Sequence, residues 1–224
     1  MKMNHIMVIS VLLAGILICM GCTIREDPET ALINYMKERY PNDTITLSPY
    51  QLHWGNPYEC YCLYFTSEKI PERTIYASRS LEDGDYIYAD NYIKYYLEDA
   101  TNAYISEIAG KYFGECKSFV HYNPGVGTLP SSFPTDATAE DILHSGLHSQ
   151  FLVYASPENI TIEEAKENFN HFKSEFEEYQ FENVEAVVYL QPDAESYKKT
   201  NSASGPSGEH DFLKKCNRVG CTSD

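Results

Sequence analysis

Two histidines and two acids in the second half of the chain have a spacing that suits metal binding. Glu140, Asp141, His144 and His148 are separated by intervals of three, four, seven and eight residues. On a helix these intervals place the side chains along one face, and imidazole with carboxylate is a ligand set that Zn²⁺ accepts. Ser145, however, stands where His-Glu-x-x-His peptidases carry their glutamate, and Gly146 weakens a helix. We therefore favour a solvated short helix without metal, and keep a metal-dependent hydrolase using His144 and His148 as an alternative.

Cysteines are the second group with reactive side chains. Apart from Cys19 and Cys22 near the N-terminus, they are Cys60, Cys62, Cys116, Cys216 and Cys221. An odd number leaves at least one thiol free or paired between molecules. Cys60 and Cys62 share a face of a predicted strand, so one of them could pair with Cys116 on a neighbouring strand. Cys216 and Cys221 could close a small loop, and the pairing stays open because spacing alone does not determine it.

Aromatic residues suggest ligand binding instead of catalysis. The chain has 19 tyrosines, of which Tyr92, Tyr95 and Tyr96 lie close together, and Trp54 stands before Gly-Asn-Pro. Exposed rings can stack on sugars or anchor a protein partner. Packing in the core explains most of these rings as well. Trp54, Tyr92 and Tyr95 are therefore candidates for a binding surface.

The N-terminus indicates export. Lys2 precedes an almost uninterrupted apolar stretch from Ile6 to Met20, and Gly21-Cys22 follows. A charged start, an apolar stretch and a small residue are typical of a signal peptide. A cysteine directly after the small residue resembles the lipobox of bacterial lipoproteins. The resemblance implies that residues 1–21 are removed and that Cys22 carries a lipid, which holds an extracytoplasmic domain at the bacterial cell membrane. A secreted protein without lipid and an uncleaved membrane anchor are the alternatives.

The charge balance narrows the range of partners. The chain has 33 acidic residues against 17 lysines and arginines, which gives a formal net charge of −16. Such a surface repels nucleic acid, so we expect no nucleic-acid partner. We also expect no cofactor. The partners that remain are the membrane, through the lipid, and an envelope protein or a carbohydrate ligand.

Local patterns predict an α+β fold in which two to three helices pack on a mostly antiparallel sheet. Asp27-Pro28 is a helix start and Pro41 ends that helix. Asp90 can cap a second helix, and Asp83-Gly84 marks a hairpin turn. The C-terminal part reads as a strand–helix–strand unit: a strand at 151–155, a helix that opens with the capping box at 161–164, and a strand at 184–190.

These elements suggest two subdomains. We expect a signal peptide at 1–21, a tether at 22–27, an α+β subdomain at 28–122, a loop at 123–138, a strand–helix–strand subdomain at 139–191 and a disordered tail at 192–224. The combined prediction is a cell-envelope lipoprotein with a non-catalytic binding or interaction domain. A metal-dependent hydrolase and an inhibitor or immunity lipoprotein that shields its own cell are the alternative functions.

Overall fold

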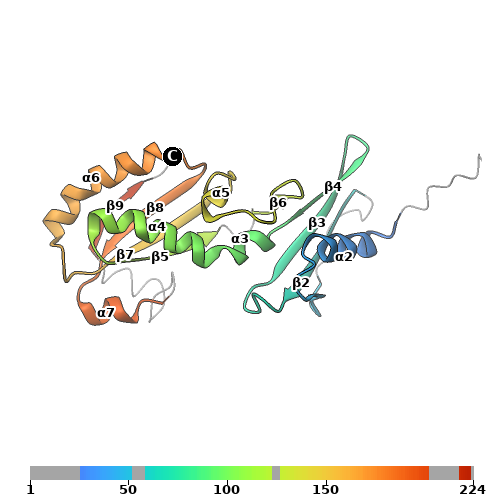
Figure 1. The fold of residues 1–224 in the computed structure, drawn as a ribbon, viewed down its shortest axis with the longest axis horizontal. Coiled ribbons are helices and arrows are strands. Elements are labelled where there is room, and N and C mark those ends of the chain that lie inside the picture. Colours follow the sequence, from blue (N-terminus) through green and yellow to red (C-terminus); the bar gives the residue numbers. More distant parts are fainter. Residues whose placement is uncertain (1–25, 52–58, 123–126, 202–216, 223–224) are drawn as a thin grey trace, which may run out of the picture.

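Two separate sheets divide the molecule into two lobes that lie side by side along its long axis (Figure 1). The structure is a computed structural model, and it describes residues 26–51, 59–122, 127–201 and 217–222. The N-terminal lobe has a five-stranded sheet in the order β1 (Ile45–Leu47), β2 (Cys60–Ser67), β3 (Ile75–Glu82), β4 (Asp85–Asp90) and β6 (Leu129–Pro130). The C-terminal lobe has a four-stranded sheet in the order β5 (Cys116–Tyr122), β7 (Ser149–Ala155), β8 (Val184–Leu190) and β9 (Asn217–Thr222).

Helix α2 (Pro28–Arg39) covers one face of the N-terminal sheet (Figure 1). Asp27 caps the helix, because its Oδ2 accepts a hydrogen bond from the Thr30 backbone N–H at 3.0 Å, and Pro28 occupies a first-turn position that needs no N–H. The helix predicted from Asp27-Pro28 is confirmed. Its buried side chains pack with the inward-facing residues of the sheet, and the core includes Leu32, Met36, Leu63, Phe65, Ile75 and Ala77.

The hairpin predicted at Asp83-Gly84 is also confirmed. Strands β3 and β4 pair antiparallel, and the pair Glu82 and Asp85 closes the ladder. Asp83 and Gly84 both have positive φ, at 51° and 94°. Two-residue turns of this kind match the twist of the strands that they join, and they favour Asp-Gly for that reason.

The C-terminal lobe is built around the predicted strand–helix–strand unit. Strands β7 and β8 pair in parallel, with helix α6 (Ile162–Glu178) between them in sequence. The capping box is present, since Thr161 Oγ1 accepts from the Glu164 N–H at 3.2 Å and Glu164 Oε2 accepts from the Thr161 N–H at 2.9 Å. Helix α4 (Glu98–Phe113) and α6 share one core with the sheet. Since every other strand pair in the described ranges is antiparallel, the predicted α+β class is confirmed.

The subdomain boundary predicted at 123–138 is wrong. Strand β5, expected in the first subdomain, pairs with β7 in the C-terminal sheet, whereas β6, inside the expected loop, pairs with β4 in the N-terminal sheet. Helix α5 (Ala139–Leu143) lies between the lobes in Figure 1. Two adjacent residues of α5 belong to different cores: Ile142 is buried in the N-terminal core and Leu143 in the C-terminal core.

The helix predicted to begin near Asp90 is two helices. The Asp90 carboxylate does accept a hydrogen bond from the Tyr92 N–H at 2.9 Å, but α3 (Tyr92–Tyr96) ends before Leu97 and α4 begins at Glu98. Ile93 is buried in the N-terminal core, whereas Ile105 is buried in the C-terminal core. The break at Leu97 therefore lies where the chain passes from one lobe to the other.

The tail predicted to be disordered contains two elements. Helix α7 (Ala194–Lys199) is capped by Asp193, whose Oδ1 accepts from the Ser196 N–H at 2.7 Å. Strand β9 pairs antiparallel with β8 and so covers the edge that β8 would otherwise present. The prediction is wrong for these two segments because a polar composition does not reveal a strand that a neighbouring edge stabilises.

A buried lysine connects the two lobes. Lys94 on α3 is only 3 % exposed, and its Nζ donates a hydrogen bond to the Gly127 carbonyl at 2.8 Å. The same ammonium lies 4.9 Å from the ring centroid of Tyr95 and 5.0 Å from that of Tyr122 on β5. Burial lowers the pKa of Lys94 to about 8.

Candidate functional site

The N-terminal lobe has a hollow beside α2 and α3 that we call the tyrosine pocket. Its cavity volume is about 390 Å³, within the usual range for small-ligand sites. Its walls come from the end of α2 and the turn after it, from the β2–β3 turn, from α3 and from the segment before α5. The lining residues are Glu38, Arg39, Tyr40, Pro41, Asn42, Asp43, Lys69, Tyr92, Ile93, Tyr96 and Thr135.

Three stacked rings form one side of the tyrosine pocket. The ring centroids of Tyr40 and Tyr92 are 4.1 Å apart, and those of Tyr92 and Tyr96 are 5.7 Å apart with an interplanar angle of 13°. Tyr40 and Tyr92 are buried, whereas Tyr96 is 48 % exposed. The stack therefore runs from the core to solvent, and it holds Tyr96 against a buried partner.

The buried end of this stack is fixed by Asp90, which is 2 % exposed. Its carboxylate accepts hydrogen bonds from the hydroxyls of Tyr35 at 2.6 Å and Tyr40 at 2.8 Å, and Arg39 Nε lies 3.3 Å away. Burial, together with the charge of Asp90, raises the pKa of Tyr35 and of Tyr40 well above the usual range, so both hydroxyls remain donors. A buried carboxylate needs partners of this kind to offset its loss of hydration.

Arg39 and Asp43 join this network to the walls of the pocket. Arg39 Nη2 donates to the Phe133 carbonyl at 2.5 Å, and Nη1 donates to the Ser131 carbonyl. Asp43 accepts from the Tyr92 hydroxyl at 2.7 Å and from the Ser67 hydroxyl. Although burial opposes it, these hydroxyl donors hold the pKa of Asp43 below its usual value. Asp43 is therefore an anion at neutral pH.

Lys69 brings a positive charge to the same pocket. Its side chain is exposed, and its Nζ lies 5.6 Å from the ring centroid of Tyr96. Glu38, in the last turn of α2, and Asn42, in the turn that follows the helix, are also exposed and line the pocket. The pocket thus combines one accessible ring with hydrogen-bonding groups of both signs.

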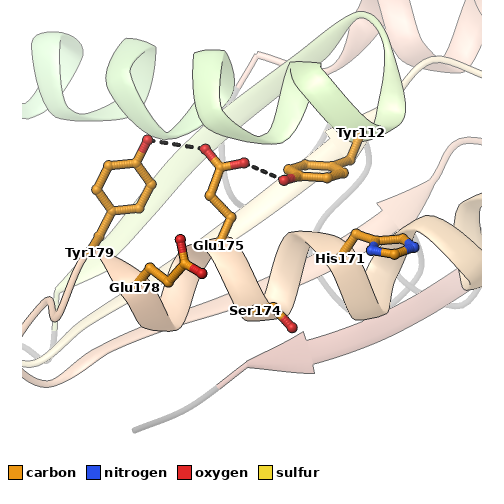
Figure 2. Close-up of a pocket in the computed structure, with 6 residues that line it drawn as sticks. All are labelled: Tyr112, His171, Ser174, Glu175, Glu178 and Tyr179. Carbon is orange, nitrogen blue, oxygen red and sulfur yellow. Dashed lines mark hydrogen bonds between the residues drawn. The ribbon is translucent and has the colours of Figure 1, made fainter.

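A larger hollow in the C-terminal lobe has a different construction. Its volume is about 590 Å³, and it lies on α4 and α6; its lining residues are Tyr112, His171, Ser174, Glu175, Glu178 and Tyr179. Figure 2 shows Glu175 between Tyr112 and Tyr179, with its carboxylate bonded to both. Lys111 Nζ also donates to Glu175 at 2.5 Å. Hydrogen bonds from Lys111 and Tyr112 hold the pKa of Glu175 below its usual value. We call this set the Glu175 clamp, because it joins α4 to α6.

The candidate metal ligands of the alternative hypothesis are not brought together. Helix α5 ends at Leu143, so His144 and His148 do not continue a helical face with Glu140 and Asp141. Asp141 caps the helix by accepting from the Thr138 N–H at 2.8 Å. His144 is exposed and its ring lies 5.3 Å from that of Phe181. Among residues 26–51, 59–122 and 127–201, no three His, Cys, Asp or Glu side chains form a group that could hold a metal ion.

The structure changes which tyrosines can belong to the predicted binding surface. Tyr92 is buried at 3 % exposure, and Tyr95 is half-buried with the Arg73 guanidinium 5.2 Å from its ring centroid. The accessible ring of this group is Tyr96. Trp54 lies outside the described residues. The four-residue interval between Tyr92 and Tyr96 is the sequence signal for the stack, since residues at this spacing meet on a helix.

Cys60, Cys62 and Cys116 form no disulfide with one another. Cys60 and Cys62 lie on β2 in the N-terminal sheet, whereas Cys116 lies on β5 in the C-terminal sheet. The predicted pairing assumed neighbouring strands, so the assignment to different sheets overturns it. Cys62 is buried, Cys60 is exposed, and burial raises the pKa of the Cys116 thiol to about 12. Cys216 lies outside the described residues, and for Cys221 the structure describes only the backbone.

The predicted lipid-bearing Cys22 and the apolar stretch before it also lie outside the described residues. Within the described ranges, no helix is both long and apolar enough to cross a membrane.

Comparison with known proteins gives little. Family models and curated protein sequences give no match to this chain. Among solved structures, it is similar to a DUF5037 family protein from Ruminococcus gnavus, at 14 % identity and a TM-score of 0.37, over 83 % of this chain and 86 % of that one. It is also similar to the fatty acid AMP ligase from Legionella pneumophila, at 12 % identity and a TM-score of 0.31, over 81 % of this chain and 34 % of that one. At these TM-scores neither similarity supports a statement about fold or function.

Proposed function

We propose that this chain is a bacterial cell-envelope lipoprotein, anchored through a lipid on Cys22, whose extracytoplasmic domain binds an envelope or extracellular component without catalysis. The ligand binds in the tyrosine pocket. The observation that supports this proposal most is the stack of Tyr40, Tyr92 and Tyr96, in which two buried rings hold a third at the surface. A ring that is fixed in advance loses little conformational entropy when it binds.

The polar groups around the pocket favour binding over catalysis. A general base or nucleophile must face the ligand with a free lone pair. Asp90 is enclosed, and its oxygens already accept from Tyr35, Tyr40 and the Tyr92 N–H. Asp43 Oδ2 accepts from Tyr92 and Ser67, and its Oδ1 is enclosed by the protein, with no hydrogen-bond partner among the described residues. These carboxylates hold the pocket in shape.

Substitution of Tyr96 tests the binding half of the proposal. We expect full-length Tyr96→Ala, purified in detergent, to co-sediment with isolated envelope fragments at least tenfold more weakly than wild type. Tyr50→Ala is the matched control, because Tyr50 is 84 % exposed and does not line the pocket. Equal loss in both variants, or no loss in either, would remove the tyrosine pocket as the binding site.

Substitution of Cys22 tests the anchor. Cells expressing the wild-type chain should incorporate an alkyne-labelled fatty acid into the protein and retain it in the membrane fraction. Cys22→Ser should lose both the label and the membrane retention. Retention of an unlabelled Cys22→Ser chain would instead indicate an uncleaved anchor formed by the stretch from Ile6 to Met20.

A further inference from the structure

We infer that the tyrosine pocket binds a neutral saccharide. This inference rests on the proposed function, because it names the ligand class of the same site. It follows from two properties of the pocket: one accessible aromatic ring, and polar groups of both signs around it.

The aromatic face suits the apolar side of a sugar ring. The C–H bonds on that side carry small positive partial charges, and the face of a tyrosine ring is negative. Tyr96 is 48 % exposed, and its stacking on Tyr92 at 5.7 Å fixes its orientation. A sugar that stacks on Tyr96 therefore meets a surface that does not need to be ordered first.

The polar lining distinguishes a neutral saccharide from a charged ligand. An anionic ligand would be attracted to Lys69 but repelled by Glu38, and a cationic ligand would meet the reverse. A hydroxyl group donates to a carboxylate and accepts from an ammonium, so it pairs with both. Asn42 and Thr135 add further donors and acceptors at the rim. A neutral ligand with several hydroxyls can form hydrogen bonds with this lining without placing like charges next to each other.

A protein partner fits the pocket less well. Protein hot spots are desolvated apolar or aromatic anchors at the centre of a large contact. Apart from the tyrosine rings, the apolar residues that line the tyrosine pocket are Pro41 and Ile93, and Ile93 is buried. The other large hydrophobic side chains that are exposed in the described segments, Leu47, Tyr50 and Ile87, do not line it. The pocket therefore resembles a site for a small polar ligand more than an anchor point for a protein.

Calorimetric titration of the full-length, detergent-solubilised protein tests the inference. The probes are maltohexaose and the hexamer of N-acetylglucosamine, which are neutral, and the hexamer of galacturonic acid, which is anionic. We expect at least one neutral probe to bind and the anionic probe to bind at least tenfold more weakly. Tyr96→Ala should weaken the neutral probe at least tenfold, and Tyr50→Ala should not.

Lys69→Gln provides a second test that does not disturb the core, because Lys69 is exposed. It should weaken the neutral probe threefold or more, since an ammonium that donates to a hydroxyl is lost. Tighter binding of the galacturonic acid hexamer than of both neutral probes would overturn the inference. If all three probes fail while wild-type protein still co-sediments with envelope fragments through Tyr96, the ligand is not a saccharide, and the proposed function stands. If the Tyr96-dependent co-sedimentation is also absent, the proposed function fails too.

Discussion

The two lobes each have a hollow lined by tyrosines and acids, but they use these residues in opposite ways. In the Glu175 clamp the carboxylate lies near the surface and its donors come from the two helices that it joins. The carboxylate that supports the tyrosine pocket, Asp90, is buried, and it accepts from Tyr40 in a stack whose last ring is exposed. The carboxylate of the larger hollow therefore joins two helices, whereas that of the smaller one supports an exposed ring. Volume alone does not identify the binding site.

Removal of the buried carboxylate should give the largest effect. Asp90→Ala leaves the hydroxyls of Tyr35 and Tyr40 and the Arg39 guanidinium without their shared acceptor inside the protein. We expect a loss of about 3–5 kcal/mol in the free energy of unfolding, measured by urea denaturation at pH 7. Asp90→Asn is the shape-matched control and should lose less, because the amide oxygen still accepts. A loss below 1 kcal/mol for Asp90→Ala would show that buried Asp90 contributes no more to stability than Glu175 does at the surface.

A substitution at the junction between the lobes should give the second largest loss of stability. Gly127 has φ of +153°, and a Cβ at this position would lie 2.6 Å from Lys94 Nζ. Gly127→Ala should therefore cost about 1–3 kcal/mol, through backbone strain and displacement of the Lys94 ammonium. Thermal unfolding followed by circular dichroism measures the loss. Gly110→Ala is the control, because a Cβ there meets open space on α4; it should be neutral or stabilising.

Lys94 should make the stability of this junction depend on pH. Its pKa is about 8 in the folded chain against 10.5 ordinarily, so between these values the unfolded chain binds a proton that the folded chain does not. The free energy of unfolding should therefore rise with pH in this window, by about 1–2 kcal/mol from this residue. Above pH 10 the sign reverses, because burial raises the pKa of Tyr35, Tyr40 and Tyr92, and the folded chain then keeps protons that the unfolded chain loses.

Lys94→Met isolates the contribution of the lysine. Urea denaturation at pH 7, 8, 9 and 10 should show a flatter profile for this variant than for wild type. The decline above pH 10 should be the same in both proteins, since the tyrosines are unchanged. Identical slopes between pH 8 and pH 10 would show that the charge of Lys94 is not the source of the rise.

The Glu175 clamp should give the smallest effect. Glu175→Gln keeps the shape of the side chain but weakens its bonds to Lys111, Tyr112 and Tyr179. Partly exposed ion pairs contribute little, so we expect a loss of about 1 kcal/mol or less, reduced further by 0.5 M salt. A loss as large as that of Asp90→Ala, in the same urea titration, would remove the distinction between the two hollows.

The sequence predicts local elements better than it predicts their partners. The helix from Pro28, the turn at Asp83-Gly84 and the capping box at Thr161 are specified by neighbouring residues, and each is present. The pairing of β5 with β7, and of β9 with β8, depends on residues far away in the chain, which no local pattern records.

The candidate site shows the same limit. The group of tyrosines near residue 92 was predicted as a binding surface, but the exposure of each ring follows from the break at Leu97 and from the packing of α3 on the N-terminal core. These long-range features bury Tyr92 and leave Tyr96 accessible. The metal-site hypothesis assumed a helix that continues to His148. The helix ends at Leu143, so the two histidines do not share a helical face with Glu140 and Asp141.

The division of Ile142 and Leu143 between two cores has a consequence for how the molecule unfolds. The chain enters the C-terminal lobe after Leu97, returns to the N-terminal sheet for β6, and then enters the C-terminal lobe again at β7. Neither lobe is a continuous stretch of sequence, so no single cut releases one of them intact. Heating should therefore melt both lobes in one cooperative transition, in which the loss of either core withdraws support from the other.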